Sequence, residues 1–146
     1  MIAAALDRFE RIYSIEIDPA LATAAQARFR GASQKVHIVC GDSAKVLTEV
    51  IKKLPDRALF WLDGHYSGPQ TGQGESDTPI LMEIEAIARQ RGGRKDVIII
   101  DDARLFGRDR DYPAAEDFLG LLRSRFGRQV LVADDSIFVL PISDSR

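Results

Sequence analysis

The sequence predicts an α/β fold in which a mostly parallel sheet lies between layers of helices. Strand-like and helix-like segments alternate along the chain, which is typical of parallel strands joined by crossover helices. Two strand-like segments, Ala58–Leu62 and Asp96–Ile100, are almost continuously apolar, which indicates strands buried on both faces. The last two strand-like segments are separated only by a short polar turn, which predicts an antiparallel hairpin at the end of the sheet.

The remaining strands are predicted from runs rich in β-branched and aromatic residues. The first run is Arg11–Ile17, with the sequence RIYSIEI, and the second is Lys35–Cys40. The final hairpin joins Gln129–Ala133 to Ile137–Ile142 through the turn at 134–136. We see no internal repeat and no linker that would divide the chain.

The helices are predicted from their caps and their apolar stripes. Asp18 can cap the helix after the first strand, and Pro19 suits its first position. Leu21, Ala25 and Phe29 fall on one face of that helix. The inward side chains of the later helices are expected to be Val46, Leu47, Val50, Ile51 and Leu54, then Ile80, Ile84, Ile87 and Ala88, then Ala115, Phe118, Leu119, Leu122 and Phe126.

Composition and charge limit the classes of function. A chain of 146 residues with 45% hydrophobic residues suits a single domain over residues 1–146. The net charge of −2 gives no electrostatic footprint for nucleic acid or for an acidic membrane, so neither is expected as a partner. Cys40 is the only cysteine, which excludes an intrachain disulfide and agrees with a reducing cytoplasm. Its place in a strand-like run predicts a small core residue.

Acidic residues follow the strand-like segments, at the ends where parallel strands bind ligands. Glu16 lies at the end of the first strand, Asp42 follows the second, Asp63 the third, and Asp101 with Asp102 the fourth. If these strands are parallel, their carboxylates converge on one edge of the sheet.

Each acid also has a structural interpretation, because aspartate after a strand often caps the next helix. Capping is the favoured role for Asp18, and for Asp42 capping and ligand binding are evenly balanced. Asp63 and the pair Asp101 and Asp102 enter loops rather than helices, so a functional role is favoured for them. Adjacent carboxylates after an apolar strand also need a counter-charge.

A divalent cation that prefers oxygen ligands, such as Mg²⁺, is one candidate for that counter-charge, and Arg104 or a cationic ligand is the other. His65 lies two residues past Asp63. It is a candidate general base, a further metal ligand or a surface histidine. The loop from Asp63 to Asp77 is longer than an ordinary connection, and Gly64–Asp77 is expected to serve as a lid or as the loop that binds the acceptor substrate.

Four segments together resemble the class I S-adenosylmethionine (SAM)-dependent methyltransferases. Arg11–Pro19 (RIYSIEIDP) resembles the second strand of that family, and Gly41–Ser43 (GDS) resembles the segment after the third. Phe60–Tyr66 (FWLDGHY) resembles the fourth-strand motif, and Ile98–Asp102 (IIIDD) the end of the fifth strand. LDG followed by IDD is similar to a subgroup of metal-dependent O-methyltransferases. The similarity covers nearly the whole chain in element order.

The resemblance implies a Rossmann-like, three-layer α/β/α fold with SAM as cofactor and Mg²⁺ as the metal. In the family, the acid that matches Glu16 binds the ribose hydroxyls. The implied cofactor-binding residues are Glu16, Asp42, Ser43 and Asp63; the implied metal ligands are Asp63, Asp101 and Asp102; and the expected catalytic residues are His65 and Asp63.

The sequence departs from the family pattern at its start. The family's first strand and the Gly-rich turn that cradles the methionine end of SAM have no counterpart, and Met1–Phe9 resembles the end of the helix after that turn. In the family's sheet order, 3-2-1-4-5-7-6, that strand is central. We therefore expect a domain that is truncated relative to the family, has lost the strand, or is completed by another chain.

The predicted activity is methyl transfer from SAM to a hydroxyl of a small molecule, a sugar or a secondary metabolite, with help from a divalent metal. One alternative is a metal-dependent hydrolase, because clustered carboxylates with a histidine also serve phosphoester hydrolysis. The other is a non-catalytic remnant of the fold that acts as a binding or dimerisation module. A small-molecule substrate is the expected partner, and a homodimer is left open.

Overall fold

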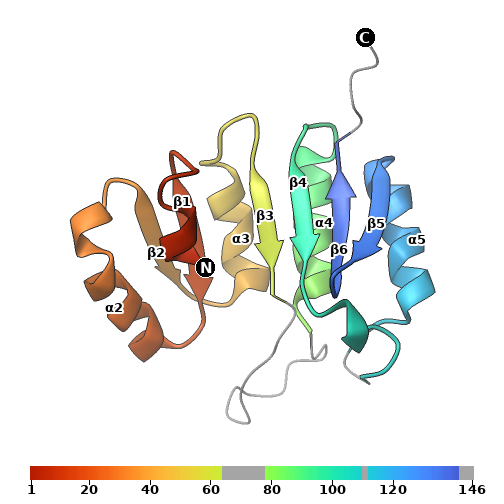
Figure 1. Ribbon diagram of the computed structural model, residues 1–146, viewed down its shortest axis with the longest axis horizontal. Coiled ribbons are helices and arrows are strands. Elements are labelled where there is room, and N and C mark those ends of the chain that lie inside the picture. Colours follow the sequence, from red (N-terminus) through yellow and green to blue (C-terminus); the bar gives the residue numbers. More distant parts are fainter. Residues whose placement is uncertain (64–77, 110–111, 142–146) are drawn as a thin grey trace. The chain divides into compact units, whose positions relative to one another are not determined.

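The computed structural model describes residues 1–63, 78–109 and 112–141, and the chain falls into two compact units. The first unit is Met1–Lys52 and the second is Lys53–Arg146. Each unit combines helices with a small sheet, so the α/β class is confirmed (Figure 1). Whether residues 1–146 form a single domain depends on how the two units are related, so the single domain stays a prediction.

The first unit contains one parallel pair of strands. Its elements are α1 (Ile2–Ala5), β1 (Ile12–Glu16), α2 (Pro19–Arg28), the 3₁₀ turn η1 (Arg30–Ala32), β2 (Val36–Cys40) and α3 (Ser43–Ile51). In the register of β1 with β2, Ile12 lies opposite Val36 and Glu16 opposite Cys40. Tyr13 and His37, which are also opposite each other, stack with their ring centroids 4.8 Å apart. Such a cross-strand pair stabilises this register.

The start of α2 is confirmed, but Leu21 does not share the burial of Ala25 and Phe29, which were predicted to lie on the same face and are half-buried. The Asp18 carboxylate accepts hydrogen bonds from the backbone N–H groups of Ala20 (2.7 Å) and Leu21 (3.1 Å), and Pro19 is the first helical residue. The Leu21 side chain, however, is 59% exposed, whereas Ala22 is buried. The small side chain of Ala22 lets the helix approach the sheet closely. The alanine-rich sequence has no strong apolar stripe that would turn Leu21 inward instead.

Cys40 is exposed, so the prediction of a core thiol is wrong. It is the last residue of β2, where the strand leaves the sheet. Val36, at the other end of the strand, is its buried residue.

The second unit contains a mixed sheet with the strand order β3-β4-β6-β5. Its elements are β3 (Leu59–Leu62), α4 (Ile80–Arg91), β4 (Val97–Ile100), the 3₁₀ turn η2 (Ala103–Leu105), α5 (Ala115–Phe126), β5 (Gln129–Ala133) and β6 (Ser136–Leu140). β3 and β4 are parallel, whereas β6 is antiparallel to both β4 and β5. The predicted hairpin is confirmed. Its two turn residues, Asp134 and Asp135, both have positive φ (48° and 60°), as a two-residue hairpin turn requires.

The core of the second unit lies between the sheet and the helices α4 and α5, which cover the same face (Figure 1). The apolar side chains predicted to face inward from these helices include Ile80, Ile84 and Leu122, and all three are completely buried. In contrast, β3 is not buried on both faces as predicted. Phe60 and Leu62 are buried but Leu59 and Trp61 are each 41% exposed, because within this unit helices cover only one face of the strand.

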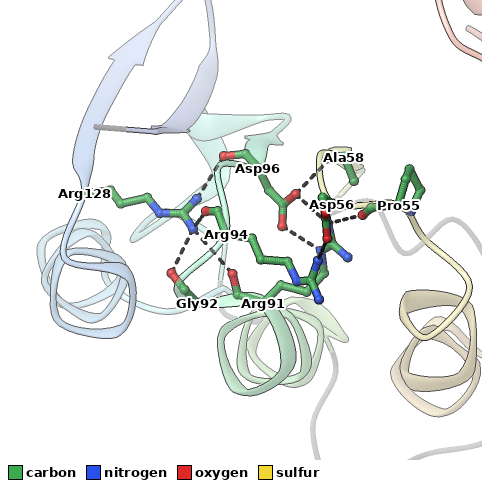
Figure 2. Close-up of polar contacts among 8 residues, drawn as sticks. All are labelled: Pro55, Asp56, Ala58, Arg91, Gly92, Arg94, Asp96 and Arg128. Atoms are coloured by element: carbon green, nitrogen blue, oxygen red, sulfur yellow. Dashed lines mark hydrogen bonds and ion pairs between the residues drawn. The ribbon is translucent and has the colours of Figure 1, made fainter. Parts of the chain in front are cut away.

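A buried ion pair joins three segments of the second unit at the start of β4 (Figure 2). The side chains of Arg91 and Asp96 are 3% and 1% exposed, and the Arg91 Nε and Nη2 atoms each donate to an Asp96 carboxylate oxygen at 2.7 Å. Arg91 Nη2 also donates to the Pro55 carbonyl (2.8 Å), and Asp96 Oδ1 accepts from the Ala58 N–H (2.8 Å). The pair therefore fixes the end of α4 and the beginnings of β3 and β4 in one arrangement.

Arg128, just before β5, extends this network. Its guanidinium donates to the carbonyls of Asp96 (2.9 Å), Gly92 (2.8 Å) and Arg94. Burial lowers the pKa of Arg128 from its usual value, and the charge of Asp96 partly offsets that shift. The first residues of β4 and β5 are thus held by one set of charge-assisted hydrogen bonds.

Arg91→Met is expected to lower the free energy of unfolding of the second unit by about 3–5 kcal/mol, because it leaves the Asp96 carboxylate buried without its counter-charge. Urea unfolding followed by circular dichroism measures the loss. Asp56→Ala is the matched control, because the Arg94–Asp56 pair is exposed and such pairs contribute little. Equal losses in the two variants would show that Arg91–Asp96 has no special role.

Candidate functional site

Glu16 lies at the carboxyl end of β1, where the chain turns toward α2. Its side chain is half-buried, and its Oε1 atom accepts a hydrogen bond from the Asp18 N–H at 2.9 Å. Its carbonyl accepts a hydrogen bond from the Gly41 N–H, also at 2.9 Å. These two bonds hold the Glu16 backbone and carboxylate at the end of the strand.

The segment after β2 depends on the glycine at position 41. Gly41 has a φ of 153°, and a β-carbon there would lie 2.9 Å from the Val46 Cγ1 atom of α3. Glycine therefore permits both the backbone turn and the close approach of α3. The next residue, Asp42, is the N-cap of α3: its Oδ1 atom accepts from the Ala44 N–H at 3.0 Å.

Of the two interpretations of Asp42, the structure supports capping, because the capping hydrogen bond is present. The other carboxylate oxygen of Asp42 lies 3.5 Å from the Lys45 ammonium. Ser43 is the first residue of α3 and is half-buried. Since β1 and β2 are parallel, Glu16, Asp42 and Ser43 lie at the same end of the first unit, as predicted.

In the second unit, Asp63 and Asp101 follow neighbouring parallel strands. Leu62 lies opposite Ile100, so these acids leave the sheet side by side, and the Asp101 N–H donates to the Leu62 carbonyl at 2.9 Å. Asp63 is exposed and Asp101 is half-buried. The two residues thus lie at the same end of this sheet, and the convergence of their carboxylates on one ligand stays a prediction.

Asp102 adopts a left-handed conformation, with φ 56° and ψ 43°. Residues other than glycine rarely adopt this conformation, although aspartate tolerates it better than most. The Asp102 N–H donates to the Asp101 carboxylate at 2.9 Å. The turn therefore directs the two carboxylates differently: the Asp101 Oδ1 atom also lies 3.5 Å from the Ser136 hydroxyl, which donates to it, whereas the Asp102 side chain meets Arg104.

Arg104 is the cation that the structure places beside these acids. Its Nη1 atom lies 2.7 Å from the Asp102 Oδ1 atom and also pairs with Asp135. Asp135 in turn accepts from the Arg104 N–H (2.9 Å), and its carbonyl accepts from the Ala103 N–H (2.8 Å). Of the two counter-charges considered from the sequence, Arg104 is thus already in contact with Asp102.

The metal site remains a prediction. Within the ranges 1–63, 78–109 and 112–141, no three aspartate, glutamate, histidine or cysteine side chains are grouped closely enough to hold a metal ion. His65 and the predicted lid at 64–77 lie outside the described residues. The convergence of all the predicted acids on one edge is tested only within each unit, because Glu16 and Asp42 belong to the first unit and the others to the second.

Sequence reasoning missed the contribution of Asp135 and Ser136, which it treated only as turn residues. Because β6 runs antiparallel to β4, the β5–β6 turn returns to the end of the sheet where β4 finishes. The sequence did predict the hairpin. If its second strand had also been predicted to pair with β4, both residues would have been placed beside Asp101 and Asp102.

Comparisons with known proteins add no family to this picture. No protein-family model matches the chain, and no curated protein matches it either. Among the described residues, no helix has the length and apolar character needed to cross a membrane.

Gly41→Ala is expected to lower the free energy of unfolding of the first unit by about 1–3 kcal/mol, because alanine is strained at this φ and its β-carbon contacts Val46. Gly31→Ala is the control, since no atom lies within 4 Å of a β-carbon there. Thermal unfolding of both variants, followed by circular dichroism, measures the difference. An unchanged Gly41→Ala protein would contradict the role given to this turn.

Proposed function

We propose that this chain is a Rossmann-like SAM-dependent methyltransferase domain that transfers a methyl group to a hydroxyl of a small molecule, with assistance from a divalent metal. The observation that carries the proposal is the placement of acids after both pairs of parallel strands. Glu16 ends β1 and Asp42 lies just past β2, and Asp63 and Asp101 follow β3 and β4. The carboxyl ends of parallel strands are where such folds bind ligands.

The strand order within each unit supports the proposal. In the family that the sequence resembles, the order 3-2 lies on one side of the first strand and 4-5-7-6 on the other. The pair β2-β1 and the sheet β3-β4-β6-β5 follow these two orders, and β6 is antiparallel to its neighbours like the antiparallel strand that ends the family's fold.

The first unit would bind the nucleoside part of SAM, which supplies an electrophilic methyl group when bound. The Glu16 carboxylate is held at the strand end through one of its oxygens and is suited to accept hydrogen bonds from ribose hydroxyls. Asp42 and Ser43, at the start of α3, would lie near the base. Positioning of the methyl group against the acceptor is the main contribution that a protein makes to such a transfer.

The second unit would bind the acceptor. Asp63, Asp101 and Asp102 offer the oxygen ligands that Mg²⁺ prefers, and a metal held there would lower the pKa of an acceptor hydroxyl. Either His65 or one of these carboxylates would then take the hydroxyl proton. Arg104 would compete with a metal for the Asp102 carboxylate, because its Nη1 atom is paired with Asp102 Oδ1 at 2.7 Å.

Glu16→Gln is expected to weaken SAM binding about tenfold or more, because a charge-assisted hydrogen bond to the ribose contributes about 1.5–3 kcal/mol. Isothermal titration calorimetry with SAM measures the change. Glu49→Gln serves as the control, since Glu49 is an exposed residue of α3 that pairs with Lys52. If SAM gives no heat with the unaltered chain, and none once a first strand and its Gly-rich turn are supplied upstream of Met1, the proposed cofactor is wrong.

Asp63→Asn is expected to weaken Mn²⁺ binding at least about tenfold, because loss of one carboxylate ligand lowers metal affinity by at least as much as loss of an outer-shell partner. Electron paramagnetic resonance of free Mn²⁺ measures the affinity. Asp117→Asn, at an exposed position in the first turn of α5, should leave it unchanged. Equal Mn²⁺ affinities for the Asp63→Asn variant and the unaltered chain would show that Asp63 is not a metal ligand.

One observation favours the non-catalytic alternative. Asp42 caps α3 and Asp102 pairs with Arg104, so two of the predicted site carboxylates already have structural partners. In a binding or dimerisation module these two carboxylates would have no role beyond these structural contacts. A folded chain that binds neither SAM nor Mn²⁺ in the two titrations above would favour this alternative.

A further inference from the structure

The edge strand β5 has a composition that is unusual for an unpaired edge. It is the last strand in the order β3-β4-β6-β5, and in the described part of the chain its outer edge pairs with no other strand. Its sequence, QVLVA, contains no charged residue and no proline. Natural proteins usually protect an open edge with charges, proline or a bulge, because a flat apolar edge pairs readily with another strand.

Side chains on both faces of β5 are exposed. Leu131 is 42% exposed, on the face that it shares with Phe138 of β6. Val132 lies on the opposite face, in the row that continues through Ile137, yet it is 56% exposed. On this second face Val130 is half-buried, so the helices cover the beginning of β5 but leave Val132, near its end, exposed to a partner.

We propose that β5 pairs antiparallel with β5 of a second copy of this chain, about a two-fold axis at Leu131. In this register Val130 lies opposite Val132 of the other copy, and the two Leu131 side chains meet. The apolar row that runs from Phe138 to Leu131 then continues into the same row of the second copy. A two-fold interface requires such self-complementarity, and the central Val-Leu-Val segment has it in both directions.

The charges that flank the strand favour this orientation. Arg128 precedes β5 and the exposed Asp134 follows it. The antiparallel register places Arg128 of each copy opposite Asp134 of the other, so opposite charges face each other at both ends of the interface, while the Arg128 guanidinium stays bonded to carbonyls of its own chain. A parallel, in-register pairing would instead place like charges opposite each other, which is destabilising.

Sedimentation velocity over a concentration series tests the dimer. The unaltered chain is expected to form dimers, and Val132→Lys is expected to shift it to monomers, because each copy then places a charged side chain on the edge. Met82→Lys is the matched control: Met82 is 53% exposed on α4 and should leave the dimer intact. A chain that is monomeric throughout, or a dimer unaffected by Val132→Lys, would overturn the proposal.

Disulfide cross-linking tests the register in a Cys40→Ser background, which removes the only native thiol. Leu131→Cys is expected to form an intermolecular disulfide, because opposite residues of antiparallel strands have Cα atoms about 4.5–5.5 Å apart. Gln129→Cys should not, because its two copies would be about 14 Å apart along the strands. Failure of Leu131→Cys to cross-link, or equal cross-linking at position 129, would overturn the register.

Discussion

The arrangement of the second unit depends on the buried pair of Arg91 and Asp96. A guanidinium and a carboxylate are both costly to remove from water, so each must keep its partner and the rest of its hydrogen bonds. Those bonds reach Pro55 and Ala58 before β3, and Arg128 adds the start of β5. The starts of β3, β4 and β5 are thus fixed by this network. The carboxyl ends of β3 and β4, where the acids lie, are aligned by the strand register and by the bonds from Ala103 and Arg104 to Asp135 in the β5–β6 turn.

The acids at the strand ends divide into two kinds once their partners are known. Asp18 and Asp42 cap the first turns of helices, a structural role that occurs in any α/β protein. Glu16 and Asp101 instead hold backbone groups within two residues of themselves and end half-buried at the rim. The second kind is the better basis for a functional argument, because no helix requires those carboxylates.

Much of the fold could be predicted from the sequence because caps and apolar periodicity are local signals. Asp18 with Pro19 marked the start of α2, and β5 has the predicted boundaries. Burial depended on tertiary packing and was less predictable: the apolar run of β3 suggested two buried faces, but Trp61 is partly exposed. The Arg91–Asp96 pair was not foreseen, since nothing in the spacing of an arginine and an aspartate reveals that both are buried.

Trp61 is the only tryptophan of the chain and lies two residues before Asp63. Its indole is partly exposed, so its fluorescence is sensitive to water and to any molecule that binds nearby. The signal comes entirely from the second unit. Tryptophan fluorescence, excited at wavelengths that Tyr13 of the first unit does not absorb, would therefore follow the second unit, whereas far-ultraviolet circular dichroism also contains the helices of the first unit. A comparison of the two signals distinguishes concerted from stepwise unfolding.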